Sequence, residues 1–173
     1  MASALMIVDV QQGMFALPSS LHRGEEVVRR IAGLLERARD AGTAVVHIQH
    51  DGGPGHVLAK GSAGWPAHPL VAPRAGEIVV EKRNSSAFHD TDLHRRLGES
   101  GVDRLVIAGM QTEMCVDSAC RAAAALDYRV VLVADGHTTY DTPQLVADLI
   151  IAHHNRLLGR GFVELLDAGQ VRF

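Results

Sequence analysis

The chain has 173 residues, of which 47% are hydrophobic and 21% charged, which is enough apolar sequence for one globular domain with a substantial core. Its net charge of −3 at pH 7 and its scattered Lys and Arg residues argue against nucleic-acid and membrane-surface partners. The N-terminal apolar run is too short for a secretion signal or a membrane span, so we expect residues 1–173 to form a single domain that starts with a strand.

Short apolar runs alternate with helical patterns along the chain. Strands are predicted where the runs fall, at residues 4–8, 43–48, 78–80, 105–108, 130–133 and 162–166. Helices are predicted at residues 27–38, from near Asp90 to Gly101, at 116–126 and from Pro143, a favoured first helical residue, to Leu157. This alternation indicates an α/β fold in which a parallel sheet has helices on both faces.

One long loop is predicted over residues 51–73, which are rich in Gly and Pro and show no periodicity. A loop of this length inside a compact domain usually has a function. Trp65, the only tryptophan, lies in its middle, so we expect this side chain to form part of a ligand pocket.

The stretch RLVIAGMQTEMCVDSACRAAAAL, residues 104–126, predicts a strand, a tight turn after Gly109 and a helix. Cys115 falls at or just inside the start of that helix, where backbone N–H groups are unpaired and the helix dipole is positive. Both effects favour a thiolate, so we expect a lowered pKa for Cys115. The alternative is a small apolar residue packed beneath the turn, because free cysteines are often buried.

Three polar residues follow strands that would end at one edge of the sheet. Asp9 follows the first strand, Lys82 the third and Cys115 the fourth. Parallel α/β sheets bind ligands at this edge, so we expect a nucleophilic site in which Asp9 accepts the thiol proton and Lys82 keeps Asp9 ionised. The alternative for each residue is ordinary, since strand-end Asp residues cap loops and most lysines are solvated.

The ten histidines raise the possibility of a metal site. His47, His50 and His56 cluster after the second strand with Asp51 between them, but neither an HxH nor an HExxH pattern is present. His47 should point sideways from the strand, and the adjacent His50 and Asp51 cannot easily face one point. We therefore expect neither a metal nor another cofactor.

The second cysteine, Cys120, lies five residues after Cys115 on the same predicted helix. Helix geometry does not bring residues at this spacing together, so we expect no disulfide between them, and Cys120 should face the core. Free thiols fit a reducing compartment, and a cytoplasmic location is the corresponding expectation.

The segments ALMIVDVQQGMF, VVEKRNSSAF, VIAGMQTEMCVDSACRAA and VLVADGHTTYD resemble the isochorismatase-like cysteine hydrolases over nearly the whole chain. The resemblance implies a three-layer α-β-α fold with a six-stranded parallel sheet in the order 3-2-1-4-5-6, and the triad Asp9, Lys82 and Cys115. It also implies a cis peptide between Met110 and Gln111, and an oxyanion hole formed by the N–H groups of Met114 or Gln111 and of Cys115. Members form homo-oligomers, so a homodimer or larger assembly is expected, and the small residues of helix 116–126 would allow close contact.

This family is functionally mixed, so several activities stay open. The presence of Cys115 favours hydrolysis of a small amide or carbamoyl C–N bond through a thioester. An isochorismatase-type vinyl-ether hydrolase would use Asp9 as an acid and could dispense with the thiol. A metal-assisted nicotinamidase-like amidase is a further alternative, although HIQHDGGPGH does not reproduce the Asp-x-His spacing of that group. The last alternative is a non-enzymatic binding or scaffold protein, and the presence of Asp9, Lys82 and Cys115 together argues against it.

We expect the substrate to be a small molecule. Aromatic residues in loops near strand ends are candidates for the pocket walls, and His50 is a candidate polar contact. The candidate substrate-binding residues are Phe15, His50, Trp65, Phe88 and Tyr140.

Overall fold

Six strands form one parallel sheet in the computed structural model, which describes residues 2–173. They lie in the order β3-β2-β1-β4-β5-β6, so the predicted six-stranded parallel sheet and its strand order are confirmed. The strands are β1 (Ala2–Val8), β2 (Ala44–His50), β3 (Ile78–Lys82), β4 (Val102–Met110), β5 (Arg129–Thr138) and β6 (Glu164–Leu166).

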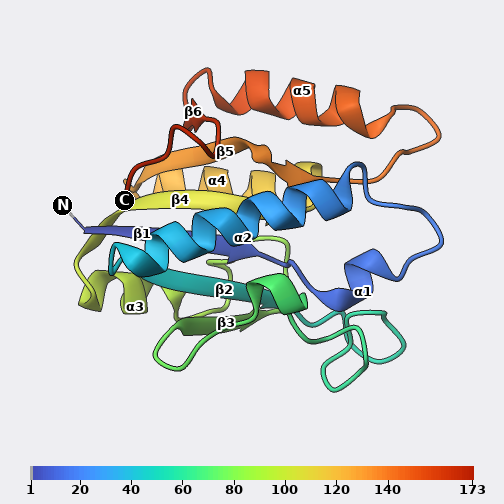
Figure 1. The fold of residues 1–173 in the computed structure, drawn as a ribbon, viewed down its shortest axis with the longest axis horizontal. Coiled ribbons are helices and arrows are strands. Elements are labelled where there is room, and N and C mark those ends of the chain that lie inside the picture. Colours follow the sequence, from blue (N-terminus) through green and yellow to red (C-terminus); the bar gives the residue numbers. More distant parts are fainter. Residues whose placement is uncertain (1) are drawn as a thin grey trace.

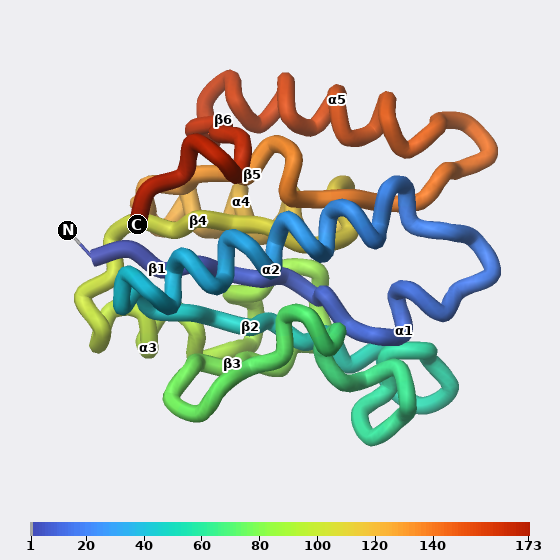
Figure 2. The backbone as a smooth tube through the Cα atoms, in the orientation of Figure 1, coloured from blue at the N-terminus to red at the C-terminus, as the bar shows by residue number. Residues whose placement is uncertain are grey.

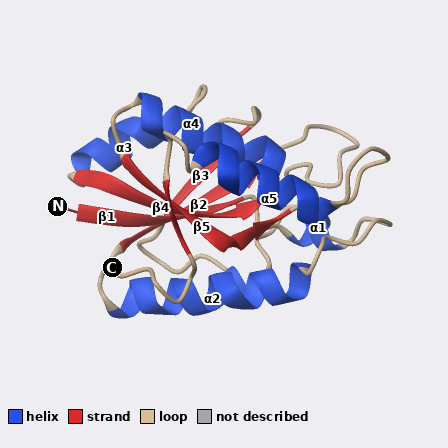
Figure 3. Cartoon of the chain, turned by 90° about the horizontal axis from the view of Figure 1, so that it is seen from above, coloured by secondary structure: helices blue, strands red, loops and turns tan. Residues whose placement is uncertain are grey.

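Helices cover both faces of this sheet (Figures 1 and 3). The helix α2 (Gly24–Asp40) lies on one face, and α3 (Leu93–Glu99), α4 (Asp117–Ala125) and α5 (Ala147–Leu158) lie on the other. Short helical turns complete the fold: α1 (Gln12–Phe15), η1 (Pro69–Val71) and the π-helical turn η2 (Thr112–Val116). Within residues 2–173, no helix combines the length and the apolar character that crossing a membrane requires.

Alternate residues of β1 enter two separate hydrophobic cores. Leu5 and Ile7 pack in the core beneath α2, whereas Ala4, Met6 and Val8 pack in the core beneath α3 and α4. This two-sided burial explains why β1 is a continuous apolar run rather than an alternating one. The α/β fold class predicted from the alternation of strands and helices is correct.

Three small residues of α4 serve the chain's own core, whereas Ala122 and Ala124 are partly exposed and Ala125 is exposed. Ala119, Cys120 and Ala123 are fully buried in the core beneath α3 and α4. The expected inward orientation of Cys120 is therefore confirmed. Ala119 and Ala123 are not available to a second chain, and the expected homo-oligomer stays a prediction.

Residues 51–73 run beside α1 at the end of the molecule where the strands finish (Figure 2). Backbone hydrogen bonds join this loop to the segment after β1, from Gln12 N–H to Pro66 O at 2.9 Å and from His68 N–H to Val10 O at 2.8 Å. The loop is thus long and irregular but held to the sheet edge at several points.

The last helix begins four residues later than predicted, at Ala147 rather than Pro143. The Thr142 hydroxyl oxygen accepts the N–H of Leu145 at 2.9 Å, and the Asp141 carboxylate accepts the N–H of Ala147 at 2.8 Å. These side chains offer the backbone a local turn in place of the helix, and the proline preference does not outweigh them.

Gly109 permits the closest approach of the two central strands. It has φ of 137° and pairs with Val8, and a Cβ atom placed on it would lie 2.1 Å from the Val8 carbonyl oxygen. Backbone atoms cannot rotate away from such a clash. The glycine therefore lets Asp9, after Val8, and the turn after Met110 lie side by side.

We predict that Gly109→Ala destabilises the fold by more than about 4 kcal/mol, because the clash and the positive φ cannot both be relieved. Gly98→Ala is the matched control, since a Cβ on this helical glycine meets nothing within 4 Å and should change stability by at most about 1 kcal/mol in the favourable direction. Denaturant unfolding of both variants measures the effect, and equal stabilities would contradict the close-approach argument.

Candidate active site

Asp9, Lys82 and Cys115 meet at the carboxyl edge of the sheet. Lys82, the last residue of β3, places its Nζ 2.7 Å from Asp9 Oδ2 and donates to Cys115 Sγ at 3.1 Å. A third donor of the same ammonium reaches the Asn84 carbonyl oxygen at 3.0 Å. The topological expectation that these three side chains converge agrees with this geometry.

The ion pair between Asp9 and Lys82 is almost completely buried, with side-chain exposures of 4% and 0%. Burial raises the pKa of Asp9 above its ordinary value, and the positive charge of Lys82 opposes that rise. The second carboxylate oxygen, Asp9 Oδ1, is buried and has no hydrogen-bond partner within residues 2–173. Asp9 therefore has one oxygen held by Lys82 and one free to accept a proton.

The expected lowering of the Cys115 pKa is wrong. Burial, reinforced by the negative charge of Asp9, raises the pKa of the Cys115 thiol to about 12, and Lys82 offsets this only in part. The resting side chain is consequently a thiol, whose proton must move to a base before or during nucleophilic attack.

The turn that carries Cys115 begins with a cis peptide between Met110 and Gln111, as the resemblance implied. The Gln111 carbonyl oxygen then accepts two N–H groups, from Met114 at 3.2 Å and from Val116 at 3.1 Å. The Met114 N–H is therefore already hydrogen-bonded within the turn, so Met114 is no longer a candidate oxyanion donor. The Gln111 N–H takes no part in these turn hydrogen bonds, so Gln111 is the better candidate to act as an oxyanion donor beside Cys115.

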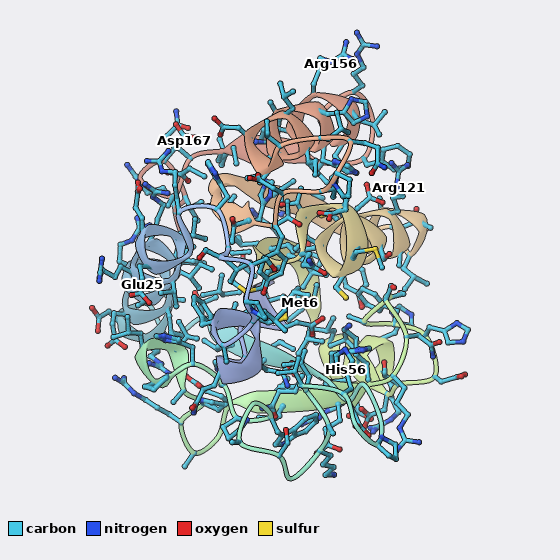
Figure 4. The ribbon with its side chains drawn as sticks, turned by 90° about the vertical axis from the view of Figure 1, so that its right-hand side faces the viewer. Met6, Glu25, His56, Arg121, Arg156 and Asp167 are labelled. Carbon is cyan, nitrogen blue, oxygen red and sulfur yellow. The ribbon has the colours of Figure 1, made fainter. Side chains whose placement is uncertain are left out.

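A cavity of about 470 Å³ opens onto Asp9 and Cys115. Figure 4 looks at the molecule from this end, with His56 labelled among the loops around the strand ends. Apolar side chains form most of the wall. The lining residues are Asp9, Met14, Leu17, His50, Gly55, His56, Val57, Leu58, Ser85, Met110, Gln111, Met114, Cys115 and Tyr140.

Two of the five predicted substrate contacts, His50 and Tyr140, line this cavity. The Tyr140 hydroxyl donates to the Met14 carbonyl oxygen, so its ring is fixed as part of the wall. The His50 Nδ1 atom lies 3.5 Å from Lys82 Nζ, and burial, together with that charge, lowers the pKa of His50.

The other three predicted contacts, Phe15, Trp65 and Phe88, are absent from the cavity lining within residues 2–173. Phe15 packs on the core beneath α2, and Phe88 packs on the opposite core with its ring 5.9 Å from that of Tyr128. Trp65 serves through its backbone, since its carbonyl oxygen accepts from the Gln11 side chain at 2.9 Å. The rings of Phe15 and Phe88 are used for packing because the cores lie directly beneath their loops.

Gln11 is a residue whose importance the sequence did not reveal. Its side chain is 1% exposed, and it both accepts the His50 N–H at 2.9 Å and donates to Trp65 O. It thus ties the end of β2 to the long loop at the cavity wall. Its place two residues after Asp9 was the available signal, because a polar residue at a strand end needs buried partners.

The candidate metal ligands are engaged with protein groups. His47 Nε2 lies 2.9 Å from Glu77 Oε2, and Asp51 Oδ1 accepts the N–H groups of Gly53 and Lys60 at 3.0 and 3.1 Å. Within residues 2–173, no three His, Cys, Asp or Glu side chains are grouped so as to hold a metal ion. These residues do not fit the metal site that the nicotinamidase-like alternative needs.

The buried side chain of His137 supports η2, the turn that carries Cys115. His137, which is 2% exposed on β5, has its Nδ1 2.8 Å from Thr112 Oγ1 and its Nε2 2.9 Å from Asn155 Oδ1. The Asn155 amide nitrogen donates to Ala134 O, so its Oδ1 is the acceptor and His137 Nε2 carries the proton. His137 therefore joins η2 to α5 as a neutral ring.

Comparison with known proteins gives a consistent result. Residues 3–153 match the family model described as "Isochorismatase domain". The chain is 44% identical over 140 residues, or 81% of its length, to a streptothricin hydrolase of Streptomyces noursei, of which the match covers 51%. The chain thus spans about half the length of the streptothricin hydrolases that it matches.

Other relatives match over more of their own length. The chain is 34% identical to a maleamate amidohydrolase of Pseudomonas putida, over 76% of this chain and 70% of that protein. Among solved structures, an isochorismatase from Pseudomonas putida is similar with a TM-score of 0.93 and 29% identity, over 98% of this chain and 90% of that one.

We predict that His137 makes stability depend on pH in the mildly acidic range. Burial lowers the pKa of His137 to about 4, from an unfolded value near 6.5, so its contribution is present above about 6.5 and is lost as pH falls toward 4. Between about pH 4 and 6.5, the slope of the free energy of unfolding against pH should be smaller in His137→Gln than in the wild type, by the contribution of about one proton. Denaturant unfolding at several pH values measures it, with His153→Gln, an exposed histidine of α5, as control. Parallel pH profiles for the wild type and His137→Gln would contradict the buried neutral ring.

Proposed function

The chain belongs to the isochorismatase family of hydrolases, and from this premise we propose that it is a cysteine hydrolase that cleaves a small amide or carbamoyl C–N bond. The observation that supports this most directly is the cluster of Lys82 Nζ with Asp9 Oδ2 at 2.7 Å and Cys115 Sγ at 3.1 Å. A nucleophile, a base and a cation that orients both are the parts that acyl transfer requires.

In the first half of the reaction, Cys115 Sγ attacks the carbonyl carbon while its proton passes to Asp9 Oδ1. The carbonyl electron pair moves onto the oxygen, which the N–H groups of Gln111 and Cys115 stabilise. The C–N bond then breaks as Asp9 returns the proton to the leaving nitrogen, and a thioester on Cys115 remains. The unpartnered Oδ1 supports this role, because the other carboxylate oxygen is already held by Lys82.

In the second half, water attacks the thioester carbonyl and gives one proton to Asp9. The C–S bond breaks, and the proton on Asp9 passes to the departing sulfur to restore the thiol. The products are a carboxylic or carbamic acid and an amine. Asp9 thus acts twice as base and twice as acid, which requires its ionised form in the resting enzyme.

One relative supports C–N chemistry in particular. The maleamate amidohydrolase is named for amide hydrolysis, and it shares 34% of its aligned residues with this chain. A vinyl-ether hydrolase of the isochorismatase type would use Asp9 as an acid without needing the thiol. The donation from Lys82 to Cys115 favours the thiol mechanism, because it stabilises negative charge on sulfur. The homo-oligomer and the cytoplasmic location stay predictions.

We predict that Cys115→Ala and Asp9→Asn each reduce turnover of an amide substrate roughly 1,000-fold or more, because they remove the nucleophile and the base. Lys82→Ala should do the same and should also raise the pKa of Cys115 further, since Lys82 lowers it now. A screen of small amides, ureas and carbamoyl compounds, including maleamate and streptothricin, supplies the assay.

Cys120→Ala is the matched control for these variants. Its thiol is fully buried in the core, and we expect full activity with mild destabilisation. Wild-type turnover by folded Cys115→Ala would exclude the thioester mechanism.

We also predict that activity does not require a metal. The thiol is activated by Asp9 and Lys82, and two candidate metal ligands, His47 and Asp51, are engaged with protein partners. Dialysis against a strong chelator should therefore leave kcat/KM unchanged within about twofold. If activity is lost on dialysis and returns with one equivalent of zinc, iron or manganese, the prediction is contradicted and the metal-assisted nicotinamidase-like alternative is favoured.

A further inference from the structure

The charges around the cavity are unevenly distributed. Among its lining residues, as the structure describes them, Asp9 is acidic and neither Lys nor Arg occurs. The walls beside Cys115 are otherwise made mostly of methionine, aliphatic and tyrosine side chains, with one serine and one glutamine as uncharged polar residues. A ligand in this cavity would meet apolar groups and a carboxylate.

Lys82 does not supply the missing cation. Its side chain is 0% exposed, and its ammonium group already reaches three partners, Asp9 Oδ2 at 2.7 Å, Asn84 O at 3.0 Å and Cys115 Sγ at 3.1 Å. An ammonium has three donors, so a ligand carboxylate could bind Lys82 only by displacing one of them.

The two histidines of the wall do not supply a cation in this geometry either. The Nδ1 atom of His56 accepts the N–H of Leu58 at 3.1 Å, and an imidazole nitrogen that accepts carries no proton. Burial and the charge of Lys82 keep His50 in its neutral form by lowering its pKa. The cavity thus offers neutral donors and acceptors but no free positive charge.

We infer that this cavity selects amides whose non-reacting part is neutral or cationic and rejects those that carry a carboxylate. A buried carboxylate needs a paired cation or several hydrogen-bond donors, and here it would face Asp9 and apolar side chains instead. The inference rests on the proposed function in that the cavity is taken as the substrate site. Among candidate substrates, the inference predicts that the anion maleamate is hydrolysed less efficiently than its uncharged diamide, maleamide.

Charge selection can be measured without a substrate by alkylating Cys115. Iodoacetamide and iodoacetate both form a C–S bond with the cysteine and release iodide. They differ only in that iodoacetamide carries a neutral amide and iodoacetate carries a carboxylate. Cys120→Ala protein leaves Cys115 as the single thiol, and each rate is divided by that of N-acetylcysteine amide in the same buffer. We expect the normalised rate of iodoacetate to be at least about tenfold lower than that of iodoacetamide. Equal or faster reaction of iodoacetate would overturn the inference.

A cation placed in the wall should reverse the preference. Leu17 and Val57 are half-buried lining residues, so Leu17→Arg should raise the relative rate of iodoacetate about tenfold over the matched neutral variant Leu17→Gln. If Leu17→Arg fails to fold, Val57→Arg with Val57→Gln serves the same purpose. Folded arginine variants that leave the rate ratio unchanged would overturn the inference, because the discrimination would not then come from wall charge.

The outcome is separable from that of the proposed function. If maleamide and every other amide resist hydrolysis while the alkylation ratio still disfavours iodoacetate, the proposed reaction fails and the charge selection stands. If amides are hydrolysed and maleamate is preferred over maleamide, the reaction stands and the charge selection fails. If neither reagent modifies Cys115 in folded protein at neutral pH, the two rates are compared at higher pH, where more of the thiol is ionised, and equal or faster reaction of iodoacetate there overturns the inference.

Discussion

The buried ion pair between Asp9 and Lys82 is the interaction on which the site depends. An isolated charge in the interior is costly, so each member requires the other, at 2.7 Å and with almost no exposed surface. Because Asp9 follows β1 and Lys82 ends β3, the pair spans the end of β2 and fixes three strand ends against one another. The approach of Val8 to Gly109 then brings the turn of Cys115 to the remaining side of the ammonium group.

The same pair sets the protonation of the nucleophile. A thiolate would add a second negative charge beside Asp9 in a buried place, and a single ammonium group does not compensate for both. In the resting site, therefore, Asp9 is a carboxylate base and Cys115 is a thiol, and no thiolate is formed in advance. Chemistry then depends on proton transfer to Asp9 Oδ1, the carboxylate oxygen that Lys82 leaves free.

Much of this arrangement could be predicted from the sequence, and the failures have physical causes. The parallel sheet and the convergence of Asp9, Lys82 and Cys115 follow from the alternation of strands and helices, which hydrophobic periodicity indicates, whereas the strand order was implied by the family resemblance. The helix-start argument for Cys115 failed because η2 consumes its own donors, with the N–H groups of Met114 and Val116 both on Gln111 O, and because burial dominates the pKa. The contacts expected for Phe15 and Phe88 failed because periodicity cannot say whether a loop side chain turns to a cavity or to a nearby core.

The resting protonation state of Cys115 is the point at which the account can be tested most directly. Ultraviolet thiolate absorbance can be followed against pH for the Cys120→Ala protein, with the Cys115→Ala, Cys120→Ala double variant subtracted. The account predicts no thiolate at neutral pH and a signal that rises only in strongly alkaline solution, in line with a pKa of about 12. A thiolate that is already formed at neutral pH would contradict it, because Asp9 would then have no thiol proton to accept.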